Sequence, residues 1–167
     1  MQESEFTALI QRHRALLHRV AFAYGRGAED RNDLLQEITL QLWRSRARYD
    51  PARPAATWIW RVALNVAISF GRRERRHRQA AALAVDAALL AATPPHVAPG
   101  HDLERLHACM ERLDPLNRAL LLLWLEGHEH AAIGETMGLS ATNVSTRLHR
   151  IRQQLRRCME SAEETAR

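Results

Sequence analysis

The 167-residue sequence contains no lysine and only two cysteines, and it has no apolar run near the roughly 20 residues of a membrane span. Two cysteines, Cys109 and Cys158, suggest no disulfide framework, so we expect a reducing cytosol as the protein's location. The N-terminus MQESEFTALIQRHR lacks the apolar centre of a signal peptide. We therefore expect a cytoplasmic protein without membrane insertion.

Spacings typical of metal, cofactor or catalytic sites are also missing. His107 lies near Cys109, and His128 near His130, but no CxxC or HxxxH spacing completes a set of four zinc ligands. No glycine-rich phosphate loop precedes a helix, and no nucleophile lies at a suggestive spacing from a base. We expect a protein that is not an enzyme and that carries neither a metal nor a cofactor.

What the sequence does contain is arginine. All 24 basic residues are arginines, and against 19 acidic residues they give a net charge of +5 and a pI near 10.4. Guanidinium groups form forked hydrogen bonds with phosphate and guanine that an ammonium group cannot form. This composition favours a polyanionic partner such as nucleic acid.

Helical periodicity recurs along the chain and strand patterns are almost absent, which predicts an all-α fold. An alanine- and proline-rich stretch divides the helices into two small domains, at residues 1–79 and 101–167, joined by a flexible linker at residues 80–100. The helices are expected at Ser4–Tyr24, Asp30–Tyr49, Ala55–Arg76, Leu103–Leu113, Pro115–Glu126, Ala131–Met137 and Ser140–Ser161.

The C-terminal domain has the outline of a helix-turn-helix, with Gly138 at the turn and Ser140 as the cap of an arginine-rich last helix. Val144, Leu148, Ile151 and Leu155 form one apolar stripe, which should face the core. The side chains expected to contact duplex DNA are Ser140, Thr142, Asn143, Thr146, Arg147 and Arg150. The alternative is that this face is merely solvated, as most charged helical faces are.

The expected helix Ala55–Arg76 carries a polar seam on an otherwise apolar helix. At spacings of three and four residues, the seam consists of Arg61, Asn65, Ser69, Arg72 and Arg76. Together with Trp58 and Trp60, such groups can hold a single strand through phosphate pairing, base-edge hydrogen bonds and stacking. The alternatives are that both tryptophans are core residues, that Asn65 is a buried amide, and that the arginines are a solvated end.

The expected helix Asp30–Tyr49 has an apolar stripe at Leu34, Leu35, Ile38 and Leu42. Its opposite, outer face is acidic and partly apolar, which on a basic protein indicates a protein partner rather than DNA. The members of this face are Asp33, Gln36, Glu37, Leu40 and Arg44.

Three segments together resemble the extracytoplasmic-function group of bacterial RNA polymerase sigma factors. They are DLLQEITLQLW (Asp33–Trp43), RYDPARPAATWIWRVALNVAISFGRR (Arg48–Arg73) and LDPLNRALLLLWLEGHEHAAIGETMGLSATNVSTRLHRIRQQL (Leu113–Leu155). The order and spacing of these segments make the likeness specific, and it covers nearly the whole chain. It implies a factor that directs core polymerase to promoters and helps to open them.

The resemblance also implies roles for particular residues. The outer face of the Asp33 helix would bind a coiled coil of the polymerase's large subunit, and the last helix would bind the upstream promoter duplex. Unstacked bases of the downstream element would be captured by the turn and the seam, as in base flipping. This downstream set is Tyr49, Arg53, Arg61, Asn65, Ser69, Arg72, Arg73 and Arg76.

Some positions depart from the family pattern. Ala55 stands where an aromatic residue is usual, Ser69 where an aspartate is frequent and Ser145 where a lysine often occurs, which affects the expected promoter sequence more than the role. Ala132 and Gly134 are expected to weaken the helix before the turn, because glycine costs about 1 kcal/mol relative to alanine inside a helix.

Two other functions remain open at this stage. One is a stand-alone, two-domain regulator that binds an operator without polymerase, and the other is a helical adaptor or antagonist that binds only protein. An anti-sigma protein is a further candidate partner under the sigma factor interpretation. Dependence of DNA binding on core polymerase separates these functions.

Overall fold

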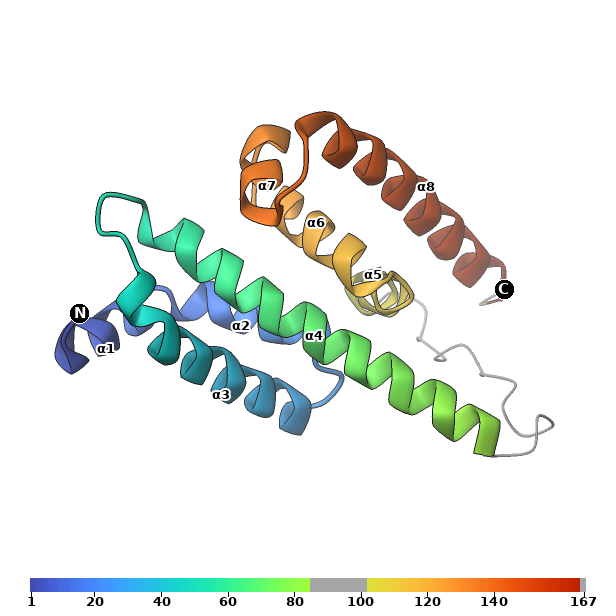
Figure 1. The fold of residues 1–167 in the computed structure, drawn as a ribbon. Helices are drawn as coiled ribbons and strands as arrows, with labels where there is room; N and C mark the ends of the chain where they lie inside the picture. Colours follow the sequence, from blue (N-terminus) through green and yellow to red (C-terminus); the bar gives the residue numbers. More distant parts are fainter. Residues whose placement is uncertain (85–101, 166–167) are drawn as a thin grey trace.

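The computed structural model describes residues 1–84 and 102–165 (Figure 1), and within these residues it is helical with no strand. The predicted all-α fold class is confirmed. The N-terminal domain contains α1 (Glu3–Arg12), α2 (Arg14–Tyr24), α3 (Ala28–Ser45), the short 3-10 helix η1 (Arg46–Arg48) and α4 (Ala55–Ala84). The C-terminal domain contains α5 (Asp102–Glu111), α6 (Pro115–Leu125), α7 (His130–Met137) and α8 (Ala141–Thr165). Among the described residues, no helix has the length and apolarity needed to cross a membrane.

In the N-terminal domain, α2, α3 and α4 pack on one another around the predicted stripe of α3. Leu34, Ile38 and Leu42 are fully buried. The prediction of one helix over Ser4–Tyr24 was wrong, because the chain breaks at His13, where φ is −104° and ψ is 14°. Phe6 of α1 packs edge-on against Trp43, with ring centroids 5.1 Å apart. The break thus coincides with a tertiary contact of α1, and no proline or glycine at His13 marks it in the sequence.

The boundaries of α3 and α4 also differ from the prediction. The helix α3 ends at Ser45, and η1 then leads into the turn before α4. The helix α4 continues past Arg76 to Ala84, into the expected linker, because the alanines there are the best helix formers. The rest of that linker, from residue 85, lies outside the described residues.

The helix-turn-helix is present as predicted. Gly138 ends α7 in the left-handed conformation, with φ at 70°, and the Ser140 hydroxyl accepts a hydrogen bond from the Asn143 amide at 3.2 Å. Gly134, however, is not a weakness of α7. A Cβ placed there would lie 2.5 Å from the carbonyl oxygen of Leu139, so the tight turn requires a glycine.

The two domains are packed against each other. The helix α4 contacts α6 and α7, and α2 contacts α5 and α6 (Figure 1), so that one hydrophobic cluster extends through both domains. The contact between α4 and α6 is close at Gly71, which has no side chain. A Cβ at Gly71 of α4 would lie 3.1 Å from Cγ of Pro115 and 3.2 Å from Cδ1 of Tyr24.

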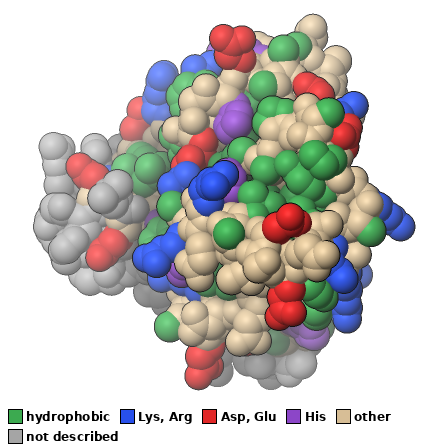
Figure 2. Space-filling model, turned by 90° about the vertical axis from the view of Figure 1, so that its left-hand side faces the viewer, with side chains coloured by type: hydrophobic (Ala, Val, Ile, Leu, Met, Phe, Trp, Pro, Cys, Tyr) green, Lys and Arg blue, Asp and Glu red, His purple; other side chains and the backbone are tan. Residues whose placement is uncertain are grey.

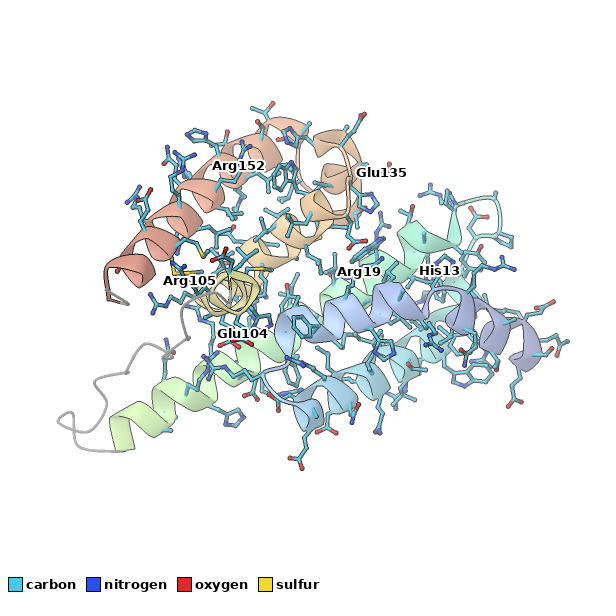
Figure 3. All side chains as sticks on the ribbon, turned by 180° about the vertical axis from the view of Figure 1, so that it is seen from behind. His13, Arg19, Glu104, Arg105, Glu135 and Arg152 are labelled. Atoms are coloured by element: carbon cyan, nitrogen blue, oxygen red, sulfur yellow. A yellow bond between two sulfur atoms is a disulfide. The ribbon has the colours of Figure 1, made fainter. Side chains whose placement is uncertain are left out.

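The two cysteines suggested no disulfide framework, but the structure contains a single disulfide between them. Cys109 of α5 and Cys158 of α8 are bonded, with their Cα atoms 5.9 Å apart. Figure 3 shows the sulfur atoms between α5 and α8, near Arg105. The two residues are separated by 49 positions in the sequence, and packing of α5 along the end of α8 brings them together.

Candidate nucleic-acid interface

The helix α8 presents the predicted polar face. Its stripe Val144, Leu148, Ile151 and Leu155 is buried, as predicted. On the other side the side chains are exposed, except that of Arg147, which is half-buried. This face consists of Ser140, Thr142, Asn143, Thr146, Arg147 and Arg150.

Hydrogen bonds on this face run along α8 itself. Nε of Arg147 donates to Oδ1 of Asn143 at 2.8 Å, and Oγ1 of Thr146 donates to the carbonyl oxygen of Thr142 at 3.0 Å. The bond from Nε leaves the N–H groups on the two terminal nitrogens of Arg147 available as a fork. Such a fork matches the O6 and N7 acceptors of guanine in a major groove.

The predicted seam lies on the surface of α4. Arg61, Asn65, Ser69, Arg72 and Arg76 are all exposed, so the alternative that Asn65 is a buried core amide was wrong. The Ser69 hydroxyl donates to the carbonyl oxygen of Asn65 at 2.9 Å. The side chain of Asn65 is thus exposed between Arg61 and Ser69 of its own helix.

Two basic groups of the downstream set already have partners on other elements. Nη2 of Arg61 donates to the carbonyl oxygen of Glu135 in α7 at 3.0 Å. Nη2 of Arg73 lies 3.1 Å from a carboxylate oxygen of Glu37 in α3. Arg61 is thus held by the other domain, and Arg73 by the outer face of the neighbouring helix.

The aromatic residues near the seam divide into a core residue and a surface pair. Trp60 is 3% exposed, as the core interpretation predicts, and its ring meets His128 edge-on at 5.8 Å. Trp58 is half-buried, and its ring lies 5.0 Å from that of Tyr49 at the start of the turn. In the same turn, Arg53 pairs with Asp50 at 3.9 Å. Of the aromatic residues near the seam, Tyr49 and Trp58 thus form a partly exposed pair, whereas Trp60 belongs to the core.

The outer face of α3 is open to solvent, as predicted. Asp33, Gln36, Glu37 and Arg44 are exposed, and Leu40 is 46% exposed.

Viewed from the end that carries the α3–α4 turn, the molecule shows basic, acidic and apolar side chains intermixed rather than one basic patch (Figure 2). On this face of the molecule, positive charge is therefore not gathered in one patch.

The junction between the domains contains polar contacts that the sequence analysis missed. Arg118 of α6 is 5% exposed, and it donates to the carbonyl oxygens of Met110, Glu111 and Leu113 and, across the junction, to that of Ala23 at 3.1 Å. The Tyr24 hydroxyl donates to the carbonyl oxygen of Pro115. Burial raises the pKa of Tyr24 above its usual range and lowers the pKa of Arg118.

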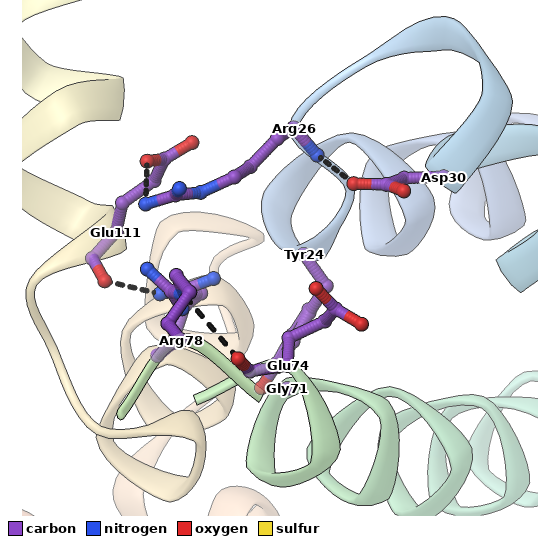
Figure 4. A pocket seen from close by; sticks show the side chains of 8 residues that line it. Tyr24, Arg26, Asp30, Gly71, Glu74, Arg78 and Glu111 are labelled. Atoms are coloured by element: carbon purple, nitrogen blue, oxygen red, sulfur yellow. Dashed lines mark hydrogen bonds and ion pairs between the residues drawn. The ribbon is translucent and has the colours of Figure 1, made fainter. Parts of the chain in front are cut away.

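Ion pairs surround these buried contacts. Arg26 pairs with Glu111 at 3.0 Å, and Arg19 of α2, labelled in Figure 3, pairs with Glu126 at 2.6 Å. Figure 4 shows the cavity at this junction, with Arg26 between Glu111 and Asp30. Its volume of about 10 Å³ is enough for one water molecule and too small for a ligand. The junction is therefore a structural contact between the domains.

Comparisons with known proteins follow the same division into two domains. Residues 9–77 match the family model Sigma-70 region 2, and residues 103–155 match the model Sigma-70, region 4. The chain is 31% identical over 153 residues to the ECF RNA polymerase sigma factor SigE of Mycolicibacterium smegmatis, covering 89% of this chain and 59% of SigE. It is 33% identical over 125 residues to the RNA polymerase sigma factor CarQ of Myxococcus xanthus, covering 74% of this chain and 71% of CarQ.

The fold is also similar to that of a solved complex. The sigma factor RpoE of Bartonella quintana, crystallised with the anti-sigma factor NepR, matches with a TM-score of 0.69 and 15% identity. The match covers 93% of this chain and 97% of RpoE. At that identity the similarity concerns the fold.

Proposed function

This chain belongs to the extracytoplasmic-function group of bacterial RNA polymerase sigma factors, and from that premise we propose how its surfaces divide the work of initiation. The outer face of α3 binds core polymerase, the polar face of α8 binds the upstream promoter duplex, and the seam of α4 with the Tyr49 turn binds the melted downstream strand. The protein works in the cytoplasm, where polymerase and chromosome are found, and it acts by binding, without catalytic groups of its own.

The observation that carries this proposal is the placement of two polar, arginine-bearing faces on two separate domains. On α8, Asn143 and Arg147 provide an amide and a forked guanidinium within a few ångströms of each other. Such groups contact base edges in a duplex. Around them, Thr142, Thr146 and Arg150 supply hydroxyl and guanidinium groups for phosphates.

On α4, the exposed amide of Asn65 supports a role with unpaired bases. An amide both donates and accepts, so it can pair with the edge of a base that has left the stack. Arg72 and Arg76 continue the same exposed face and can hold the strand's phosphates. The Tyr49–Trp58 pair offers an aromatic surface at the other end of the seam, near the start of α4.

On α3, the mixed character of the outer face supports a protein contact. Asp33 and Glu37 supply negative charge, and Leu40 supplies exposed apolar surface. A charged rim around an apolar centre is typical of protein interfaces. An anti-sigma factor remains a candidate second partner, because the similar RpoE fold was crystallised with one.

Reconstituted transcription tests this proposal. Purified chain would be added to core polymerase, and transcripts from a fragmented genomic library would be sequenced at their 5′ ends. We expect a small set of start sites that depends on both components, with shared upstream and downstream elements. Sequence-specific DNA binding by the chain alone would instead support a stand-alone regulator, and absence of transcripts together with protein-only binding would support an adaptor.

A further inference from the structure

The protein's only two cysteines lie in the C-terminal domain and are bonded to each other across α5 and α8. They differ in accessibility. Cys109 is 4% exposed within the core, whereas Cys158 is half-buried on the side of α8. A reagent from solution can therefore reach the sulfur of Cys158 before that of Cys109.

The bond lies beyond the buried stripe of α8, near the end of the helix. Leu155 is the last buried residue of its stripe, and Glu160 and Ser161 are exposed. Beyond Leu155, α8 is tied to α5 by the disulfide and by a hydrogen bond from Nη2 of Arg105 to the carbonyl oxygen of Met159 at 2.9 Å. Loss of the disulfide would remove the covalent tie between α5 and the end of α8.

The helix α5 also connects this region to the rest of the molecule. His107 is hydrogen-bonded to the carbonyl oxygen of Phe22 at 2.9 Å, and Glu111 pairs with Arg26. The disulfide thus joins the end of the recognition helix to a helix that is itself bound to the N-terminal domain. A cross-link between elements far apart in sequence stabilises the fold mainly by restricting the unfolded chain.

We propose that Cys109 and Cys158 form a reversible thiol–disulfide exchange site for low-molecular-weight disulfides such as oxidised glutathione. The Cys158 thiolate attacks one sulfur of the small disulfide, forming a mixed disulfide and releasing one thiol. The Cys109 thiolate then attacks the sulfur of Cys158, forming the Cys109–Cys158 bond and releasing the second thiol. Overall, two protein thiols and one small disulfide yield one protein disulfide and two small thiols.

The two sulfurs therefore have different roles. Cys158 is the entry point and Cys109 is the resolving residue. The physical consequence of the exchange is a higher melting temperature of the oxidised chain. At a temperature where the oxidised chain is folded and the reduced chain is unfolded, only the oxidised chain presents the α8 face to DNA. This consequence rests on the proposed function.

Equilibration of the purified full-length chain with reduced and oxidised glutathione tests the site. Intact-mass spectrometry should show a monomer lighter by the two hydrogens lost on bond formation and free of bound glutathione. Its melting temperature should be about 5–10 °C above that of the reduced chain. The variant with both Cys109→Ala and Cys158→Ala should melt at one temperature whatever the glutathione ratio.

The single variants separate the two roles. Cys109→Ser should accumulate a stable glutathione adduct at Cys158, and Cys158→Ser should react at least roughly tenfold more slowly, because its remaining thiol is buried. Equal rates for the two variants, a stable glutathione adduct on the wild type, or equal melting temperatures of the oxidised and reduced chains would each overturn the proposal.

Duplex binding distinguishes this inference from the proposed function. At a temperature between the two melting points, only the oxidised chain, in complex with core polymerase, should bind a promoter found by the transcription experiment. If neither form binds any promoter while the mass and melting results hold, the proposed function fails and the exchange site stands. If both forms bind equally at that temperature, the consequence for α8 is wrong.

Discussion

The helices α4 and α8 have the same amphipathic pattern, but the polar side chains of their exposed faces bond to different partners. Each buries an apolar stripe and exposes a row of polar and basic side chains on the opposite side. On α8, the hydrogen bonds of Asn143 and Thr146 stay within the helix. On α4, by contrast, Arg61 is bonded to α7 of the other domain and Arg73 to Glu37 of α3.

This difference shows that an exposed arginine is not necessarily free to bind a ligand, because it can already be bonded within the protein. Under the proposed function, α8 would meet a duplex with a face whose hydrogen bonds are made within the helix itself. The seam of α4 can offer all the donors of Arg61 to a strand only after Nη2 of Arg61 leaves the carbonyl oxygen of Glu135. The packing of the two domains therefore limits one surface and leaves the other open.

The largest expected effect comes from forcing the domains apart. Gly71→Leu places a side chain where even a Cβ meets Pro115 and Tyr24, and overpacking of this kind costs roughly 1–3 kcal/mol. We expect a larger radius of gyration by small-angle scattering and a lower melting temperature. A strand that binds the full seam should bind this variant more tightly than the wild type.

The control adds the same side chain to α4 outside the junction. Arg75 is exposed, so Arg75→Leu should leave the radius of gyration unchanged. A compact Gly71→Leu protein with wild-type stability would contradict the view that the domains are held together through this contact.

The next effect tests the open surface. Arg147→Ala should weaken binding to the upstream element by about 1–3 kcal/mol and relax base preference at one position, because its fork would no longer pair with guanine. Quantitative binding of the polymerase complex to a promoter library measures both quantities. Arg156→Ala, near the end of α8, is the control for a phosphate contact and should weaken all sequences alike. Unchanged affinity of Arg147→Ala on every template would remove α8 from the interface.

A smaller effect is expected in the seam. Asn65→Ala should slow promoter opening roughly fivefold, an effect of about 1 kcal/mol for one lost hydrogen bond to a base. The defect should persist on a pre-melted template that carries the preferred base and shrink when that base is replaced. Since Asn65 is exposed, the melting temperature should not change. A defect that is independent of the base would show that Asn65 does not contact it.

The smallest effect on folding is expected on α3. Glu37→Arg breaks the ion pair with Arg73, but both side chains are nearly half exposed, so the cost in stability should stay below about 1 kcal/mol. Affinity for core polymerase, measured by titration, should nevertheless fall severalfold if Glu37 faces the enzyme. Arg73→Ala breaks the same ion pair and keeps the carboxylate. If the two variants lose affinity equally, the ion pair rather than Glu37 is the determinant.

Local patterns predicted most of the helices and the three exposed faces. The stripes Leu34–Ile38–Leu42 and Val144–Leu148–Ile151 follow from the period of an α-helix, and the turn follows from Gly138 and Ser140. These features depend on residues a few positions apart. The roles of the exposed faces remain predictions.

Features that depend on distant residues were not predictable in this way. Arginine is usually an exposed residue type. Arg118 is nevertheless buried, because it donates hydrogen bonds to carbonyl oxygens such as that of Ala23, 95 positions away. The disulfide likewise needs the packing of α5 on α8 before its sulfurs meet. At Gly134, helix propensity indicated a weak helix. The structure shows instead that a glycine is needed there, because the carbonyl oxygen of Leu139 leaves no room for a Cβ.

The hydrophobic cluster that runs through both domains also determines how the free chain comes apart. Because Tyr24, Trp60 and Leu120 belong to the same cluster, neither half can unfold without hydrating side chains that stabilise the other. Heating should then produce a single calorimetric transition, in which the van't Hoff enthalpy equals the measured enthalpy, rather than two transitions for two tethered modules. In its free state the protein is one cooperative folding unit whose two halves become independent only when their shared surface is exposed to water.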